Sequence, residues 1–183
     1  MKYRIAVFPG DGVGAELINE GIKVAEKATE LDKFEIEWVR YPHGAEHYLE
    51  TKEGLNEKIL KDIGDNCNAI YCGTFDNSVK EIGNIASSIR NYFDQFVNLR
   101  PIKLLPSVES YIAGKTSNEI NFMLIRENTE DFYVNGSGTA KSGKNRQQLD
   151  IGTSAFKAKF GLSIEAKGSD IAYHIGILSK KRM

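Results

Sequence analysis

Three arginines stand at the edges of apolar segments, where a buried cation would need a partner. They are Arg90, Arg100 and Arg126, and each comes directly after a Leu or Ile. An unpaired buried guanidinium is costly, and guanidinium groups pair bidentately with carboxylates. If the three converge, they form an arginine clamp for a substrate with two or three carboxylates. Spacing alone favours the alternative, in which each arginine makes its own structural salt bridge.

The segment 126–133 reads RENTEDFY and follows an apolar run that predicts a buried strand over residues 120–126. Strand ends are common sites for catalytic groups in α/β folds. A tyrosine hydroxyl near cations, here that of Tyr133, can act as a general acid or base. Without further information, a capped turn is the favoured interpretation.

The glycine-rich segment PGDGVG, residues 9–14, lies between an apolar run and a helical pattern, which is the context of a phosphate-binding turn. Its glycines stand at positions 10, 12 and 14, which is not the GxGxxG spacing. No Gly-Lys-Ser/Thr follows, so it is not a Walker loop either. The spacing favours a tight turn over a phosphate cradle.

Other candidate side chains are weaker. His43 and His47 have the i, i+4 spacing that could face one metal, but an exposed pair is favoured because no HExxH motif is present. We expect Cys67 and Cys72 to lie in a strand on opposite faces, buried as small hydrophobic side chains.

The apolar periodicity indicates alternating strands and helices, which is typical of an α/β layer with a mostly parallel sheet. The first block predicts strands over 3–8, 34–39 and 69–72, and helices over 15–31, 43–49 and 55–63. The second block predicts a helix over 79–92 and no helix over 97–105 before Pro101. It also predicts an exposed loop or arm over 134–148 and hairpin strands over 156–164 and 171–178.

Composition narrows the class of protein. The chain has 183 residues with 24 Lys and Arg against 25 Asp and Glu, a net charge of −1, which argues against bulk electrostatic binding to nucleic acid or an anionic membrane. No apolar stretch approaches the roughly 18 residues of a membrane span. Two cysteines cannot form a disulfide framework, so we expect a reduced, cytoplasmic compartment.

Three motifs occur together and in order: IAVFPGDGVGAE at 5–16, IRNYFDQFVNLRPIKLLP at 89–106 and LIRENTEDFYVNG at 124–136. On these motifs the chain resembles the β-decarboxylating dehydrogenase family of isocitrate, 3-isopropylmalate, homoisocitrate and tartrate/D-malate dehydrogenases. The resemblance implies an α/β, isopropylmalate-dehydrogenase-like fold with a non-Rossmann, mostly parallel sheet and a second, smaller domain with an extended arm. We expect residues 1–98 in the large cofactor-side domain, 99–133 in the small substrate and dimer domain, and 134–183 in the arm.

The resemblance also implies a reaction. Such enzymes oxidise a 2-hydroxy dicarboxylic or tricarboxylic acid with NAD or NADP, lose the β-carboxylate as carbon dioxide and reprotonate the enol, using a bound Mg or Mn ion. Arg90, Arg100 and Arg126 match the family's carboxylate-binding arginines, and Tyr133 matches the tyrosine that assists protonation. Gly73-Thr74 matches loosely the loop near the nicotinamide.

Substrate choice depends on two residues, Ala86 and Asn84, which precede Arg90 by four and six positions. Where isopropylmalate enzymes typically have leucine and isocitrate enzymes asparagine, this chain has Ala86, and where isocitrate enzymes have serine it has Asn84. Alanine cannot hydrogen-bond a third carboxylate, which argues against isocitrate and modestly favours 3-isopropylmalate. The segment FDQFVNLRP also resembles tartrate and D-malate enzymes.

The family's catalytic lysine, metal-binding aspartates and adenosine-binding segment match no residue of this chain. We therefore expect it to be the N-terminal half of such an enzyme, inactive by itself. The alternative is a non-catalytic regulatory or binding subunit that retains the arginine clamp. Residues 134–183 carry nine Lys and Arg against three Asp and Glu, and we expect this arm to form a homo-oligomer contact, as a dimer or tetramer.

Overall fold

A computed structural model describes residues 1–182, and these form two compact units. Unit 1 comprises residues 1–93 and unit 2 begins at Asp94. The chain is α/β, as the sequence predicts, because a parallel sheet with helices makes up unit 1. Within residues 1–182 no helix has both the length and the apolar character needed to cross a membrane.

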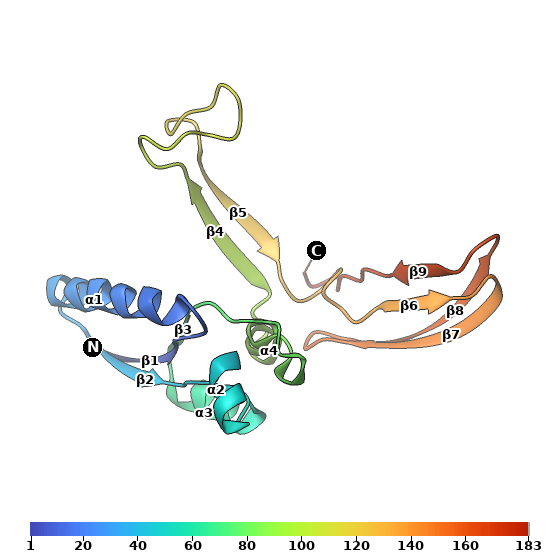
Figure 1. The fold of residues 1–183 in the computed structure, drawn as a ribbon, viewed down its shortest axis with the longest axis horizontal. Helices are drawn as coiled ribbons and strands as arrows, with labels where there is room; N and C mark the ends of the chain where they lie inside the picture. Colours follow the sequence, from blue (N-terminus) through green and yellow to red (C-terminus); the bar gives the residue numbers. More distant parts are fainter. Residues whose placement is uncertain (183) are drawn as a thin grey trace. The chain divides into compact units, whose positions relative to one another are not determined.

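The sheet of unit 1 has three parallel strands in the order β2-β1-β3 (Figure 1). Its strands are β1 (Lys2–Phe8), β2 (Glu35–Arg40) and β3 (Ala69–Cys72). The connection from β1 leads to β2 on one side, and the next connection crosses β1 to reach β3 on its other side. The order therefore reverses at the carboxyl ends of β1 and β3, where open α/β sheets bind their ligands.

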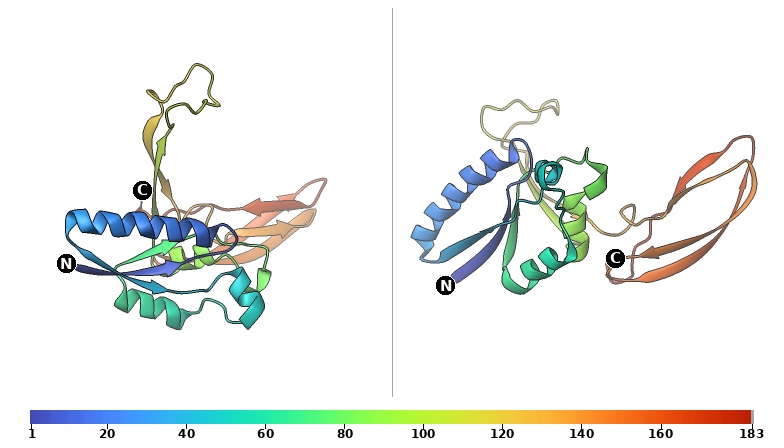
Figure 2. Two further views of the ribbon diagram at one scale, coloured as in Figure 1. Left: turned by 60° about the vertical axis from the view of Figure 1, so that its left-hand side comes forward. Right: turned by 60° about the horizontal axis from the view of Figure 1, so that its bottom comes forward.

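Helices cover both faces of this sheet, because right-handed connections in opposite directions place them on opposite sides (Figure 2). They are α1 (Gly14–Asp32), α2 (Ala45–Thr51), α3 (Glu57–Asn66) and α4 (Ile85–Tyr92). Val7 packs with Ile18 and Ile22 of α1. The alternate residues Ala6 and Phe8 point to the other face and form the main core, together with Leu60, Ile63, Ile85 and Ile89 of α3 and α4.

The predicted helix over 79–92 is shorter in the structure. A short 3₁₀ turn, η1 (Lys80–Ile82), is followed by Gly83 with φ +60°, and α4 begins only at Ile85. The side chain of Asn84 caps α4 by accepting a hydrogen bond from the Ser87 N–H at 2.8 Å. The glycine and the cap break the helical pattern, because a left-handed residue and an N-cap both lie outside the helix they precede.

In unit 2, two long strands form an antiparallel pair with no further strand on either edge within the described residues (Figure 1). They are β4 (Val97–Lys103) and β5 (Asn121–Glu127). The prediction of a strand near residues 120–126 is confirmed, but its predicted burial is wrong. Phe122 and Met123 are half exposed and Ile125 is 70% exposed, because nothing in residues 1–182 covers the pair.

The arm is built from four strands rather than from a long loop. They are β6 (Ser137–Ala140), β7 (Gly143–Gly152), β8 (Lys157–Ala166) and β9 (Ile171–His174). Of the two forms predicted for 134–148, an exposed loop or an arm, the structure shows the arm: the segment contains β6 and the start of β7, whose exposed polar residues alternate with half-buried ones. The strands predicted over 156–164 and 171–178 correspond to β8 and β9, but they do not form a hairpin with each other, because β8 pairs with β7 and β9 with β6.

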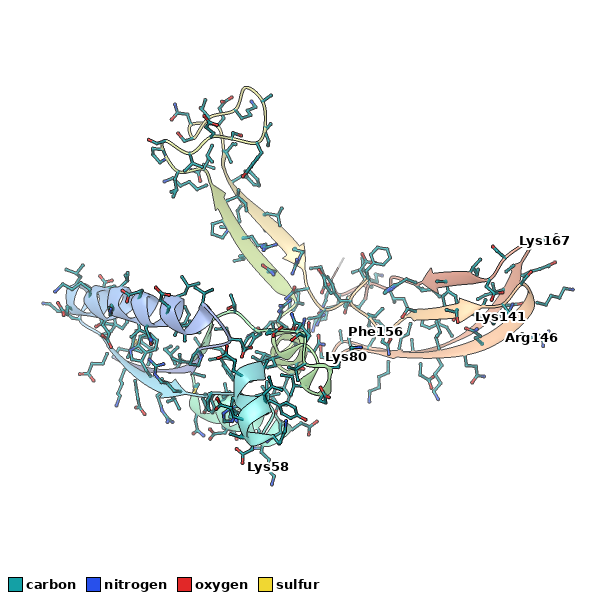
Figure 3. All side chains as sticks on the ribbon, in the orientation of Figure 1. Lys58, Lys80, Lys141, Arg146, Phe156 and Lys167 are labelled. Carbon is teal, nitrogen blue, oxygen red and sulfur yellow. The ribbon has the colours of Figure 1, made fainter. Side chains whose placement is uncertain are left out.

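This arm is a two-stranded ribbon that folds back on itself, so that the β7-β8 pair lies along the β6-β9 pair (Figures 1 and 2). The Gln147 amide donates to the Thr139 carbonyl at 2.6 Å, which joins the two layers. The buried apolar residues of this part of the chain are Val134, Ala140, Ile151 and Ala166. Figure 3 labels Lys141, Arg146 and Lys167 together at the end where the ribbon turns back.

Candidate functional site

The register of β4 and β5 brings two of the three predicted arginines onto one face. Asn98 pairs with Arg126, and Arg100 pairs with Leu124. Residues directly opposite each other in an antiparallel pair share a face, and residues two apart along a strand share it too. Arg100 and Arg126 are therefore diagonal neighbours on the same face, a separation of about 7–8 Å for such pairs.

The guanidinium of Arg126 is held by neutral groups. Its Nη2 donates to Oδ1 of Asn128 at 2.8 Å, and its Cζ lies 5.6 Å from the ring centroid of Tyr133. Its Nε is shielded from solvent and has no hydrogen-bond partner. Buried donors normally have a partner, so this unmet N–H is where an additional acceptor would bind.

Neither Arg100 nor Arg126 forms an ion pair with a carboxylate anywhere in residues 1–182. The alternative drawn from spacing alone, a structural salt bridge for each arginine, therefore does not describe these two. Together with Tyr133, whose side chain is half exposed, they form a cationic cluster, defined as Arg100, Arg126 and Tyr133. Its uncompensated charge and open face suit a carboxylate ligand.

The third arginine, Arg90, belongs to unit 1 and lies in the last turn of α4. Although Cys72 as a residue is exposed, burial raises the pKa of its thiol to about 11, an effect that the Arg90 guanidinium partly opposes. Arg90 therefore lies within electrostatic range of the end of β3. Ala86 lies one turn earlier on the same helix and is half buried, while Asn84 caps that helix.

The two glycine-containing loops predicted near a cofactor contact each other at the carboxyl ends of β1 and β3. The Asp11 N–H donates to the Thr74 carbonyl at 2.7 Å, and the Thr74 hydroxyl donates to the Asp11 carbonyl at 2.9 Å. A Cβ on Gly73 would overlap the Pro9 carbonyl oxygen, so only glycine fits there. The Gly73-Thr74 segment and the PGDGVG turn thus form one rigid backbone surface.

The side chain of Asp11 joins a third segment to this surface. Asp11 is buried, and its carboxylate accepts from the Glu46 N–H at 2.9 Å and from the Asp76 N–H at 2.8 Å. The Glu46 carboxylate in turn accepts from the Gly12 N–H at 3.0 Å. No spacing signal in the sequence identifies these partners, because Glu46 and Asp76 lie 35 and 65 positions further along the chain.

These contacts bear on whether the PGDGVG segment is a tight turn or a phosphate-binding loop. The N–H groups of Asp11, Gly12 and Gly14 all donate to acceptors within unit 1. A phosphate cradle needs such N–H groups to point at the ligand. These three N–H groups are therefore already used within the turn, which supports the tight-turn interpretation.

His43 and His47 differ from the exposed pair that the sequence favours. Both are half buried, their ring centroids lie 5.3 Å apart, and one nitrogen of each ring is shielded without a hydrogen-bond partner. Burial lowers the pKa of His43, and His47 lowers it further. Among residues 1–182 no group of three or more His, Cys, Asp or Glu side chains is arranged to hold a metal ion.

The predicted placement of the two cysteines is also wrong. Cys67 is the C-cap residue of α3, not a strand residue, because that helix continues to Asn66. Cys72 ends β3 and is exposed. Both thiols are free.

Sequence reasoning missed a second charged cluster at the other end of the RENTEDFY turn. The Arg182 side chain is 4% exposed and pairs with Asp94, with Glu127 at 3.7 Å and with the fully buried Glu130 at 3.3 Å. Arg182 had contributed only to a count of basic residues, and nothing in its local sequence distinguishes it from the two lysines before it.

The observed parts describe an α/β chain whose two-stranded sheet carries unpaired arginines beside a tyrosine. Residues 4–171 match the family described as isocitrate/isopropylmalate dehydrogenase. The chain is 33% identical over 151 residues to a 3-isopropylmalate dehydrogenase of Clavibacter michiganensis subsp. michiganensis, covering 78% of this chain and 41% of that protein. It is 33% identical over 154 residues to a decarboxylating D-malate dehydrogenase of Escherichia coli, covering 79% of this chain and 41% of that protein.

Among solved structures, an isocitrate dehydrogenase from Methylococcus capsulatus matches with a TM-score of 0.62 and 20% identity, covering 98% of this chain and 43% of that one. This likeness supports the fold. The chain belongs to the isocitrate/isopropylmalate dehydrogenase family. It spans about two fifths of the length of the curated relatives it matches.

Proposed function

We propose that the chain is the substrate-binding portion of a metal-dependent, NAD- or NADP-dependent β-decarboxylating dehydrogenase. Its substrate class is a 2-hydroxy dicarboxylic acid, with 3-isopropylmalate favoured and isocitrate, homoisocitrate, tartrate or D-malate as alternatives. One observation carries the proposal: Arg100 and Arg126 share a face and have no acidic partner within residues 1–182, and Arg126 lies beside Tyr133.

In this proposal the arginine clamp of Arg90, Arg100 and Arg126 binds the carboxylates. A guanidinium accepts a carboxylate bidentately, which fixes the orientation of the substrate as well as its position. The shielded Nε of Arg126 is a donor that the protein leaves unmet and that a carboxylate oxygen satisfies. The carboxylate that stays in the product is thereby distinguished from the one that leaves.

Tyr133 would supply the proton that completes the reaction. A bound nicotinamide would supply the acceptor for the hydride that leaves the hydroxyl-bearing carbon. Loss of carbon dioxide then leaves an enol, and a proton passes from the Tyr133 hydroxyl to its carbon. The Arg126 guanidinium lies beside the ring, with its Cζ 5.6 Å from the ring centroid, and so would help to hold the ring in place.

The described residues fit a nicotinamide cofactor better than they fit a metal ion. The surface formed by Gly73, Thr74 and the PGDGVG turn offers a wall for a nicotinamide, and the Asp11, Gly12 and Gly14 N–H groups of the turn are engaged within unit 1. For Mg or Mn the described residues do not fit, since they contain no ligand set. We expect the metal ligands outside this segment, and no step is derived through the ion.

Substrate preference would depend on the start of α4. Ala86 has too little side chain to bind a third carboxylate, and its small volume leaves room for an apolar branch. Asn84 has its Oδ1 engaged in capping, so it acts on the substrate mainly by fixing where α4 begins. This combination favours 3-isopropylmalate over isocitrate.

We further propose that residues 1–98 belong to a cofactor-side domain, 99–133 to a substrate and dimer domain, and 134–183 to an arm for homo-oligomer contact in the cytoplasm. The outward face of β7 and β8 is polar, carrying residues such as Lys144, Arg146 and Lys159. A partner subunit would therefore contact this face through polar and charged groups.

The first test is activity. The purified 183-residue chain is expected to form no NADH from 3-isopropylmalate with NAD and Mg, and measurable metal-dependent turnover would contradict the proposal that it is only a portion of the enzyme. In the enzyme that carries this chain, kcat/KM values for 3-isopropylmalate, D-malate and isocitrate rank the substrates. A large preference for isocitrate would overturn the role given to Ala86.

The second test separates the enzyme from the binding-subunit alternative. In the same enzyme, Y133F should lower kcat by about 10²–10⁴-fold with little change in KM, which is the usual contribution of a positioned acid or base. Y111F is the matched control, because Tyr111 is fully exposed in unit 2. An unchanged kcat in Y133F would remove the catalytic role and favour a subunit that only binds carboxylates.

A further inference from the structure

We propose that Asn128 is a positioning residue, which fixes the guanidinium of Arg126 through a neutral amide and so leaves its positive charge available for a substrate carboxylate. This inference rests on the proposed function, because it explains how one arginine of the clamp is kept ready for an anion. It assigns a role to a residue that neither touches the reacting atoms nor carries a charge.

The contacts of Asn128 are those of a rigid support. The residue follows β5 directly and is 5% exposed. Its Oδ1 accepts from Arg126 at 2.8 Å and from the Asn98 amide at 3.5 Å, while its Nδ2 donates to the Gln95 carbonyl at 3.3 Å. A side chain hydrogen-bonded through both ends of its amide and excluded from water has little freedom to rotate. Arg126 is thus anchored at one nitrogen.

The choice of an amide matters because unit 2 holds another arginine differently. Arg182 is surrounded by Asp94, Glu127 and Glu130, which neutralise its charge and make it a structural group. Arg126 has an amide where Arg182 has carboxylates. A carboxylate in place of the Asn128 amide would keep the hydrogen bond to Arg126 but would pair with its charge. The neutral partner therefore separates the positioning of the guanidinium from its neutralisation.

Two substitutions separate these effects. N128A removes the support and keeps the charge of Arg126, whereas N128D keeps an acceptor for Arg126 and compensates its charge. Both lose the donor to Gln95, so that loss does not distinguish them. N118D is the matched control, because it adds the same charge at an exposed asparagine of unit 2.

The readout is the affinity of the 183-residue chain for D-malate and for 3-isopropylmalate, measured by titration calorimetry without metal or cofactor. We expect N128A to weaken binding about 3–10-fold and N128D about 10–100-fold, with N118D within about twofold of the original chain. A purely structural amide predicts the opposite order, since N128D keeps a bond to Arg126 that N128A loses. Binding by N128D within about threefold of the original chain would overturn the proposal.

A ligand-independent measurement keeps the two proposals distinguishable. The shielded Nε–H of Arg126 should give a slowly exchanging ¹⁵N resonance, which N128A should shift or broaden and N118D should leave in place. If the original chain binds neither diacid, the proposed function fails, and this resonance alone decides whether Asn128 positions Arg126. Whether or not the chain binds a diacid, an unchanged Arg126 resonance in N128A overturns the inference about Asn128. This measurement also replaces the affinity comparison if N128D fails to fold.

Discussion

The two units differ in how far the apolar residues of their strands are buried. In unit 1, alternate residues of β1 pack against helices on both faces, and Ala6, Val7 and Phe8 are completely buried. In unit 2, the β4-β5 pair is equally apolar in sequence, yet Leu99 is 59% exposed and Ile125 is 70% exposed. The same kind of pattern thus forms a core in one unit and an uncovered sheet in the other. Within residues 1–182, unit 2 is stabilised instead by polar clusters and by the layered arm.

The largest contrast should appear in core substitutions. F8A should lower the free energy of unfolding of unit 1 by about 3–5 kcal/mol, because a fully buried aromatic side chain leaves a cavity. I125A should change the stability of unit 2 by less than about 0.5 kcal/mol, because its side chain is already largely in water. Urea unfolding measures both. A large loss in I125A would mean that the β4-β5 faces are covered in solution.

The stability of unit 2 should instead depend on the ion pairs of Arg182 with Asp94, Glu127 and Glu130. R182A should destabilise it by about 3–5 kcal/mol, because it leaves the fully buried Glu130 without its cation. K181A is the matched control at an exposed neighbour and should stay within about 0.5 kcal/mol. Hydrogen exchange of peptides from β5 and the arm would locate the effect. Equal results for the two variants would remove the structural role given to Arg182.

In unit 1 the contact between the PGDGVG turn and the Gly73-Thr74 segment should contribute to stability in the same way as the Arg182 cluster does in unit 2. G73A should cost about 1–3 kcal/mol, because its methyl group would overlap the Pro9 carbonyl and force the loops apart. G12A faces open space and should cost about 1 kcal/mol through its positive φ of +56° alone. Fluorescence of Trp38, the one tryptophan of the chain, follows unfolding of this unit. A G73A variant as stable as G12A would contradict the close contact.

The smallest expected difference concerns pH. Hydrogen bonds from Ser154 and Arg182 hold the pKa of Asp94 below its usual range, so its contribution to unit 2 is present above about pH 4 and is lost as the pH falls. Burial and the hydrogen bond to Asp62 raise the pKa of Tyr41, so its contribution to unit 1 is present below about pH 10 and is lost as the pH rises.

The two variants D94N and Y41F should flatten these dependences separately. D94N should remove the acid-side loss in unit 2 and leave the alkaline side of unit 1 unchanged, and Y41F should do the reverse. Unfolding midpoints between pH 3 and 11 measure both, with the tryptophan signal reporting unit 1. An acid-side loss that persists in D94N would assign it to other carboxylates.

The contrast between the two units also explains which structural features could be predicted from the sequence. The strands and helices of unit 1 are predicted well because each meets its partners within the segment. The late helix start at Ile85 comes from a local cap at Asn84, and Cys67 was misplaced because α3 continues to Asn66. In unit 2 the strand at 121–127 is predicted but its burial is not. An apolar pattern reports what a strand requires for burial, and the residues that would supply it are not among those described.

For the site, residue type and order were enough to select Arg100, Arg126 and Tyr133. Their support could not be predicted, because the hydrogen bond from Arg126 to Asn128 depends on side-chain direction after a strand end. The cluster around Arg182 joins residues 52 or more positions apart along the chain, which no local pattern encodes.

The contact of Arg182 with Asp94 has a consequence for how the segments of unit 2 are tied together. It joins two residues 88 positions apart in the chain, so it links the segment before β4 to the segment after β9. A contact of this range closes a long loop of chain, which lowers the conformational freedom of the residues between its ends. The β4-β5 pair and the arm thus lie within one closed loop, which an ion pair holds in place of a covalent cross-link.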